Sequence, residues 1–406
     1  MLNVIKKTLT FVVCRSQPAA VLLTALILPP AAARANPLDR HTLSEEASRF
    51  PNLVRVITGR IERNPPLYYE VRLGRLAGEL RSFPGDLRKY DDAAVAYHRI
   101  KRDDEAIQYM ERKRAVLERA NPADRAVREH WLRYYENVGA FWAHRWLRAG
   151  ADRNRIDEIR CARGYVLQAQ KMGADERIGL RYLLEILDWI IAPRSKSKNE
   201  SQTLGAYLGD SDVDARIVGL ARLVLADDAW ERVDVFEALA AVLDRSGRAA
   251  LGYLAKLRCA ELIDAGRGSV IPGAPTGRDL KRFLRLDVAP LLVADRDEIS
   301  DQFHALRNEA ETFRRERDTH FIERLKSGID PDTDIMFWRN FSNAPPPSLD
   351  LPWPKYVAHK LRGETLLISV IFGSAAILLI IASLAVVRAV ATFKKRKREL
   401  RTPPAI

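Results

Sequence analysis

Residues 93–122 read AAVAYHRIKRDDEAIQYMERKRAVLERANP, and they carry the pattern that decides the fold. Small and large apolar residues recur at helical spacing on both sides of a charged break at residues 101–104. Asp103 and Asp104 place negative charge in the first turn of the second segment, where the helix dipole favours it. The stretch therefore predicts two short antiparallel helices.

The same composition extends over residues 36–191, and we expect this range to be one helical domain. It is rich in Ala, Leu, Arg and Glu, and it is interrupted by residues that end helices: Pro51, Pro65, Pro66, Pro84, Pro122 and Gly150. Asp91 and Asp92 precede AAVAYHRI, and Asp124 precedes RAVREHWL, so we expect these aspartates to cap helices or to place favourable negative charge in a first turn. The sequence predicts an all-α fold.

The stretch resembles a tetratricopeptide repeat, in which small residues let two helices approach and large residues fill the seam between them. The matching positions are Ala94, Tyr97, Ala106 and Met110, and a second copy matches at Gly139, Trp142, Ala162, Val166 and Ala169. Lys113 departs from the pattern, because the family prefers a small residue there, and about eleven extra residues separate Trp142 from Ala162. The resemblance implies stacked helical hairpins, an α-solenoid, over residues 87–173, and a generic helical bundle is the alternative.

The resemblance also implies a groove lined by the first helix of each hairpin. Its candidate residues are Arg88, Asp92, Val95 and Arg99 in the first copy and Arg133, Asn137, Ala140 and His144 in the second. The carboxylate-clamp pattern of some family members is not reproduced, because Asp91 and Val95 stand at positions that carry basic and amide residues there. A protein partner of open chemical class is implied.

A second helical block follows a polar loop. Residues 192–212 begin with the Ser- and Lys-rich run APRSKSKNESQ and read as a linker, and residues 213–344 return to helical periodicity. We expect a Gly- and Pro-rich loop at 266–279 and a helix from about Arg282. The stripe of Ile299, Phe303, Leu306, Ala310 and Phe313 predicts a helix packed on the body, and Arg317 interrupts that stripe.

Residues 365–387, TLLISVIFGSAAILLIIASLAVV, carry no charge. A helix of this length spans roughly 34 Å at about 1.5 Å per residue, enough for a bilayer core of about 30 Å. The preceding residues 345–364 are Pro-rich, and the tail 388–406 holds seven Lys or Arg against Glu399. We therefore expect a transmembrane helix with a cytoplasmic tail that also attracts anionic lipid.

Residues 1–35 have the features of a secretory signal peptide: Lys6, Lys7 and Arg15, then an apolar run, then Ala33-Arg34-Ala35 as a cleavage site. A retained N-terminal anchor is the alternative. Together with the C-terminal span, this predicts a single-pass protein of the bacterial inner membrane whose large domain lies outside the cytoplasm. No oligomeric state follows from the sequence.

The net charge of +13 belongs mostly to the two ends. Without residues 1–35 and 388–406, 55 basic and 52 acidic residues remain, which argues against nucleic acid as a partner. Beyond Cys14 in the expected signal, Cys161 and Cys259 lie in helical patterns, and we expect two free thiols.

No motif predicts a catalytic, cofactor-binding or metal-binding residue. The seven histidines are scattered and are interpreted as surface or groove residues, and Asp330, Asp332 and Asp334 lack the glycine and glutamate of a calcium loop. Ser195 and Lys198 have the spacing of an acyl-transfer pair but lie in a polar loop. We therefore expect a non-enzymatic, membrane-anchored interaction scaffold of the cell envelope. The alternative is an envelope enzyme of the cell-wall hydrolase type, whose carboxylates meet only in the fold.

Overall fold

The computed structural model describes Leu43, Ala47, Phe50, residues 52–173, 178–192, 203–226, 229–289, 291 and 293–342, and the separate residues Ala385, Arg388 and Thr392. The expected signal peptide, the Pro-rich linker and nearly all of the expected span and tail lie outside these residues. Within the described part of the chain, no helix is both long and apolar enough to cross a bilayer. Leu38–Pro352 forms one compact unit, which contains all of the helices discussed below.

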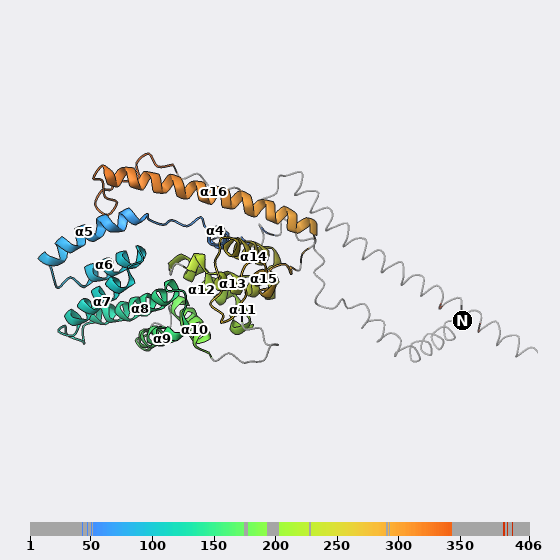
Figure 1. Ribbon diagram of the computed structural model, residues 1–406, viewed down its shortest axis with the longest axis horizontal. Helices are drawn as coiled ribbons and strands as arrows, with labels where there is room; N and C mark the ends of the chain where they lie inside the picture. Colours follow the sequence, from blue (N-terminus) through green and yellow to red (C-terminus); the bar gives the residue numbers. More distant parts are fainter. Residues whose placement is uncertain are drawn as a thin grey trace, which may run out of the picture. The chain divides into compact units, whose positions relative to one another are not determined.

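The unit is all-α, and the described residues contain no strand. The first helices along the chain are α4 (Leu53–Thr58), α5 (Pro66–Ser82), α6 (Leu87–Arg99), α7 (Asp103–Leu117), α8 (Arg125–Arg148), α9 (Ile156–Lys171) and α10 (Ile178–Ile191). Each helix from α5 to α10 packs on the next one in the chain (Figure 1). The antiparallel pair expected from residues 93–122 is confirmed as α6 and α7.

Helix α6 begins earlier than the sequence predicts. Its N-cap is Asp86, whose carboxylate accepts a hydrogen bond from the backbone N–H of Arg88 at 3.1 Å. The expectation that Asp91 and Asp92 cap this helix is therefore wrong, because both lie in its interior and pair with cations on other helices. Asp124 caps α8 as expected, through the N–H of Ala126 at 2.8 Å.

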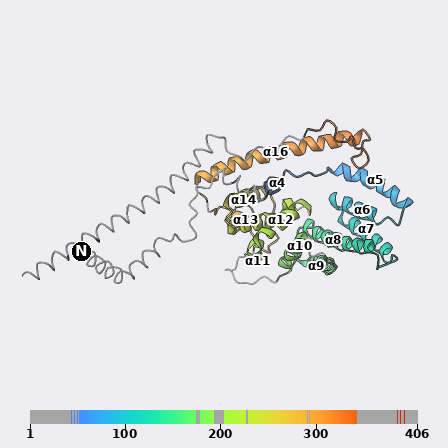
Figure 2. The same cartoon turned by 180° about the vertical axis from the view of Figure 1, so that it is seen from behind.

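The second part of the chain contains α11 (Leu204–Leu208), α12 (Val213–Ala226), α13 (Val233–Arg245), α14 (Ala249–Asp264), α15 (Gly277–Phe283) and α16 (Val293–Lys326). A short 3-10 turn at Ala229–Glu231 precedes α13, and another at Arg153–Arg155 lies between α8 and α9. Helix α11 lies inside the expected polar loop 192–212. Thr203 caps it, and Leu204 and Leu208 are buried where it packs on α13. Figure 2 shows this group of helices from behind.

Helix α16 continues well beyond the apolar stripe that predicts it. The stripe residues from Ile299 to Phe313 are buried, which confirms the packed face. The helix also continues through Arg317, whose guanidinium lies 4.7 Å from the rings of both Phe321 and Trp338 and donates to the carbonyl of Arg63 at 3.1 Å. It packs on α14 and α4 and, at its other end, on α5 (Figure 1).

The prediction of a helix that begins at about Arg282 is wrong. Helix α15 ends at Phe283, and Arg285 adopts a left-handed φ of 55°, which breaks the helix. Leu284, Leu286 and Leu291 are nevertheless buried, because the turns after α15 direct them into the core. The prediction failed because these leucines follow one another at irregular spacing, which does not require a helix.

The two helical blocks share one hydrophobic core. Its buried members run from Leu43 through Trp146 and Phe236 to Leu306, and a smaller cluster around Met110 fills the seams between α6, α7 and α8. Cys161 is exposed and Cys259 is buried, and both are free thiols as expected.

Candidate binding face on helices α6 and α8

Helices α6 and α8 run parallel and in register. The side-chain amide of Asn137 donates to Asp91 Oδ1 at 3.4 Å, and the rings of His98 and His144 lie 4.9 Å apart. Both contacts join residues separated by 46 positions in the sequence, so the two helices advance in the same direction. The candidate residues of the two helices are offset by 45 positions, which places the two sets beside each other.

Helix α7 is antiparallel to both neighbours. Toward α6, Tyr97 packs on Tyr109 with ring centres 5.1 Å apart, while Asp91 pairs with Lys113, so an earlier residue of α6 meets a later residue of α7. Toward α8, Tyr134 donates to Glu111 at 2.9 Å, and Lys113 donates to the carbonyl of His130 at 3.1 Å. Helices α6 and α8 are thus parallel, and α7 packs antiparallel against both. Successive helical hairpins produce this arrangement.

The small residues of the pattern lie where the helices come closest. Ala94, Ala106 and Met110 are fully buried in the cluster between α6, α7 and α8, and Ala162, Val166 and Ala169 are fully buried on α9. A methyl group added at Gly139 would lie 2.7 Å from a methyl carbon of Val166 and 3.1 Å from the carbonyl oxygen of Ala162. Gly139 therefore sets the close approach of α8 and α9.

Lys113 is accommodated by a buried ion pair. Its side chain is fully buried, and its ammonium lies 2.7 and 2.8 Å from the two carboxylate oxygens of Asp91. Burial raises the pKa of Asp91 and lowers the pKa of Lys113, and the attraction between the two charges opposes both shifts. Asp91 thus partners the lysine that departs from the repeat pattern and, through Asn137, links α6 to α8.

The eight candidate residues differ in how accessible they are. Arg88 and Arg133 are exposed, and neither side chain forms a hydrogen bond or an ion pair within the described part of the chain. Val95, Arg99, Asn137 and Ala140 are partly buried, and Asp92 forms an ion pair with Arg72 at 3.2 Å. His144 is only 6% exposed and does not lie on the face.

The histidines at the far end of α6 and α8 belong to a buried polar cluster that the sequence did not indicate. His98 Nδ1 lies 2.8 Å from Asp103 Oδ1, and Arg148 donates to the carbonyl of His98 at 3.1 Å and also pairs with Asp103. Burial lowers the pKa of His144 well below its ordinary value, so this imidazole is neutral at physiological pH. The interpretation of His98 and His144 as surface or groove residues is therefore wrong.

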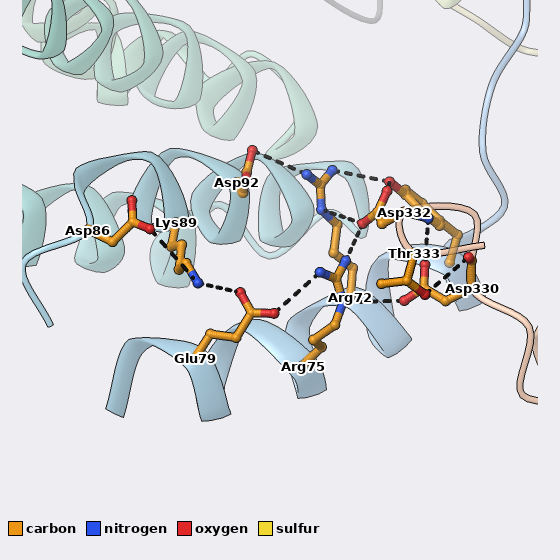
Figure 3. A network of polar contacts seen from close by, with 10 residues as sticks. Arg72, Arg75, Glu79, Asp86, Lys89, Asp92, Asp330, Asp332 and Thr333 are labelled. Atoms are coloured by element: carbon orange, nitrogen blue, oxygen red, sulfur yellow. Dashed lines mark hydrogen bonds and ion pairs between the residues drawn. The ribbon is translucent and has the colours of Figure 1, made fainter. Parts of the chain in front are cut away.

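A network of ion pairs joins α5, α6 and the loop after α16 (Figure 3). Arg72 lies 3.2 Å from both Asp92 and Asp332, Arg75 lies 3.3 Å from Asp330 and also pairs with Asp332, and Tyr68 donates to Asp332 at 2.8 Å. Burial raises the pKa of the Tyr68 hydroxyl, and its hydrogen bond to Asp332 adds to this shift. Of the aspartates compared with a calcium loop, Asp330 and Asp332 thus hold the loop after α16 against α5.

Helix α13 carries two buried acids, Asp234 and Glu237. Burial raises the pKa of Asp234 and raises that of Glu237 to about 7. Asp234 accepts hydrogen bonds from the Ser269 hydroxyl and the Val270 N–H, and Glu237 accepts one from the Gly205 N–H at 3.0 Å. Both carboxylates therefore fix neighbouring segments in place.

Comparison with known proteins identifies no relative of this chain: no protein-family model, no curated protein and no solved structure matches it.

Proposed function

We propose that this chain is a protein-interaction scaffold of the bacterial cell envelope, anchored in the inner membrane by residues 365–387. Its helical body lies outside the cytoplasm, and the outer face of α6 and α8 binds a segment of a partner protein. In this proposal α6–α7 and α8–α9 are tetratricopeptide-like hairpins. The signal-like residues 1–35 and the basic tail 388–406 support the orientation.

The observation that carries the proposal is the parallel, in-register packing of α6 and α8. Parallel first helices of successive hairpins present their side chains as one continuous surface, which is how helical-repeat proteins bind extended segments of other proteins. The spacing of 46 residues between contacting positions is longer than the 34 residues of a regular repeat, because α8 carries extra turns at its start.

The chemistry of the face favours an acidic segment with small apolar side chains. Arg88 and Arg133 offer two exposed guanidinium groups that form no ion pair or hydrogen bond among the described residues, and Val95 and Ala140 add apolar surface beside them. Burial raises the pKa of Asp91, and the positive charge of Arg133 opposes this rise. Asp92 forms an ion pair with Arg72, which also contacts Asp332. An exposed arginine of this kind binds carboxylates with two parallel hydrogen bonds.

The test is proximity labelling in living cells with the full-length chain, with the labelling enzyme inserted directly after residue 36. We expect a recurrent envelope protein among the labelled neighbours, and we expect its labelling to fall in the double variant Arg88→Glu and Arg133→Glu. The matched control is Arg128→Glu with Arg278→Glu, because these arginines are also exposed on helices and form no polar contact with described side chains.

Both double variants change the net charge by the same amount, and circular dichroism checks that both fold. Equal loss in both variants would show a general charge effect and would contradict the assigned face. Labelling of a recurrent neighbour that is unchanged by either variant would also contradict the face, and the lack of any recurrent neighbour would contradict the scaffold.

A further inference from the structure

The loop after α16 exposes a compact group of large apolar side chains. Ile335 is 93% exposed, Met336 is 47% exposed and Trp338 is 41% exposed. The other exposed large apolar residues in the described part of the chain are scattered singly over different helices and loops. Single exposed apolar residues are ordinary in proteins, whereas a contiguous group marks an interaction surface.

This exposure is imposed by a fixed turn. Phe337, in the middle of the group, is 1% exposed and packs against Phe321 with ring centres 4.8 Å apart. Its carbonyl lies 2.8 Å from His320 Nε2, and the carbonyl of Met336 accepts a hydrogen bond from Arg324 at 2.7 Å. Asp334 accepts a hydrogen bond from the N–H of Met336 at 2.8 Å. Phe337 therefore anchors the turn, and Ile335 and Met336 are held outward. The ring of Trp338 packs with one side on His320 and Phe321 and leaves the rest of its surface exposed.

Two cations beside this turn are available to an anionic surface. Arg339 and Lys326 are exposed, and neither side chain has a polar partner among the described residues. Asp330 and Asp332 are paired with Arg75 and Arg72 across the network in Figure 3. Asp334 accepts a hydrogen bond from the N–H of Met336 and keeps its negative charge, and Glu323 lies exposed on α16, so two carboxylates lie beside the two cations.

The length of the chain after this turn limits its distance from the apolar segment 365–387. Residues 343–364 separate Ser342 from the apolar segment that begins at Thr365, and these 22 residues span at most about 80 Å when fully extended. The turn is thus tethered within about 80 Å of the apolar segment, and a tether raises the effective concentration of any surface within its reach. This step rests on the proposed membrane anchorage.

We propose that Ile335, Met336 and Trp338 bind the bilayer that carries the chain, as a second membrane contact in addition to the transmembrane segment. Ile335 and Met336 enter the boundary between headgroups and acyl chains, Trp338 lies at headgroup depth, and Arg339 and Lys326 contact anionic lipid phosphates. The contact fixes the distance and tilt of the helical body relative to the membrane.

The experiment places an environment-sensitive NBD fluorophore on the full-length chain in liposomes that contain an anionic phospholipid. Cys14 and Cys161 are changed to serine, Cys259 is buried, and the label is attached at Ile335→Cys. The matched control carries the label at Tyr207→Cys, because Tyr207 is 47% exposed on α11. We expect a blue-shifted emission and quenching by nitroxide-labelled lipids at position 335 and neither effect at position 207.

Two further measurements distinguish a failure of the membrane anchorage from a failure of the contact at position 335. Flotation of the liposomes reports the anchorage itself: a chain that does not float contradicts the proposed function and this inference together. A chain that floats while position 335 behaves like position 207 overturns this inference alone. A blue shift that persists in detergent and grows with protein concentration would show that a second copy of the chain covers the turn, which also overturns it. Arg339→Glu with Lys326→Glu is expected to reduce the lipid quenching at position 335.

Discussion

At the scale of single residues, Glu237 makes the stability of the fold depend on pH. Its carboxylate is buried on α13 and accepts a hydrogen bond from the backbone of Gly205, but burial dominates and raises its pKa from 4.5 to about 7. In the folded state this group therefore binds its proton more tightly than in the unfolded chain. Its contribution to the free energy of unfolding is greatest below pH 4.5 and is lost as the pH rises to about 7.

We predict that Glu237→Gln removes this dependence. The loss in the wild-type chain amounts to about 3 kcal/mol across that interval, because each unit of pKa shift corresponds to about 1.4 kcal/mol. Urea unfolding of both chains in detergent at pH 4.5 and pH 8 should show the variant gaining stability relative to wild type at the higher pH. Other titrating groups contribute to both chains and cancel in the difference, so an equal difference at the two pH values would contradict the prediction.

Lys113 has a partner on another helix that the sequence alone does not identify. The sequence identifies it as a departure from the repeat pattern, but the carboxylate that accommodates it comes from Asp91, on the preceding helix. The same limit applies to His144, which helical spacing places on the candidate face and which packing against His98 buries. Arg88 and Arg133, also placed on that face by helical spacing, are exposed, because a charged side chain on the outer face of a helix needs no distant partner.

At the scale of helices, the seam between α8 and α9 depends on the absence of a side chain at Gly139. Replacement of glycine by alanine inside a helix ordinarily stabilises a protein by about 0.5–1 kcal/mol. At Gly139, however, the new methyl group would contact the backbone of Ala162 and Val166, which cannot move away at low cost. We predict that Gly139→Ala destabilises the fold by about 1–3 kcal/mol, as overpacking does.

Gly164 provides the matched control, since it lies on α9 and a methyl group added there has no neighbour within 4 Å. Gly164→Ala should therefore raise the unfolding temperature while Gly139→Ala lowers it, as measured by circular dichroism. The same sign in both variants would show that α8 and α9 do not pack through Gly139.

Helix type was easier to predict than helix boundaries. Periodic apolar residues identified α6, α7, α8 and the packed face of α16, because each buries a regular stripe. The sequence missed α11, which has few residues and begins at Thr203 inside a polar stretch. The sequence also predicted that the apolar stripe of α16 ends at Arg317. In the structure the helix continues, because the guanidinium of Arg317 stacks on aromatic rings and donates a hydrogen bond to a backbone carbonyl.

At the scale of the whole molecule, residues 38–352 form one unit in which helices from both sequence blocks share a core. Helix α16 packs on α14 at one end and on α5 at the other, and α5 packs on α6. The candidate face on α6 is therefore connected through α5 and α16 to the loop from which the chain continues toward residues 365–387. In the proposed function, this unit is the body that the anchor holds outside the cytoplasm, with the face of α6 and α8 available to a partner.

The orientation of this body in the membrane is the central claim, and reporter fusions in bacterial cells measure it directly. Alkaline phosphatase, which is active only after export, and green fluorescent protein, which fluoresces after folding in the cytoplasm, are each fused after residue 342 and after residue 406 of otherwise intact chains. The account predicts phosphatase activity at 342 and fluorescence at 406. Fluorescence with no phosphatase activity at 342 would place the helical body in the cytoplasm and contradict the account.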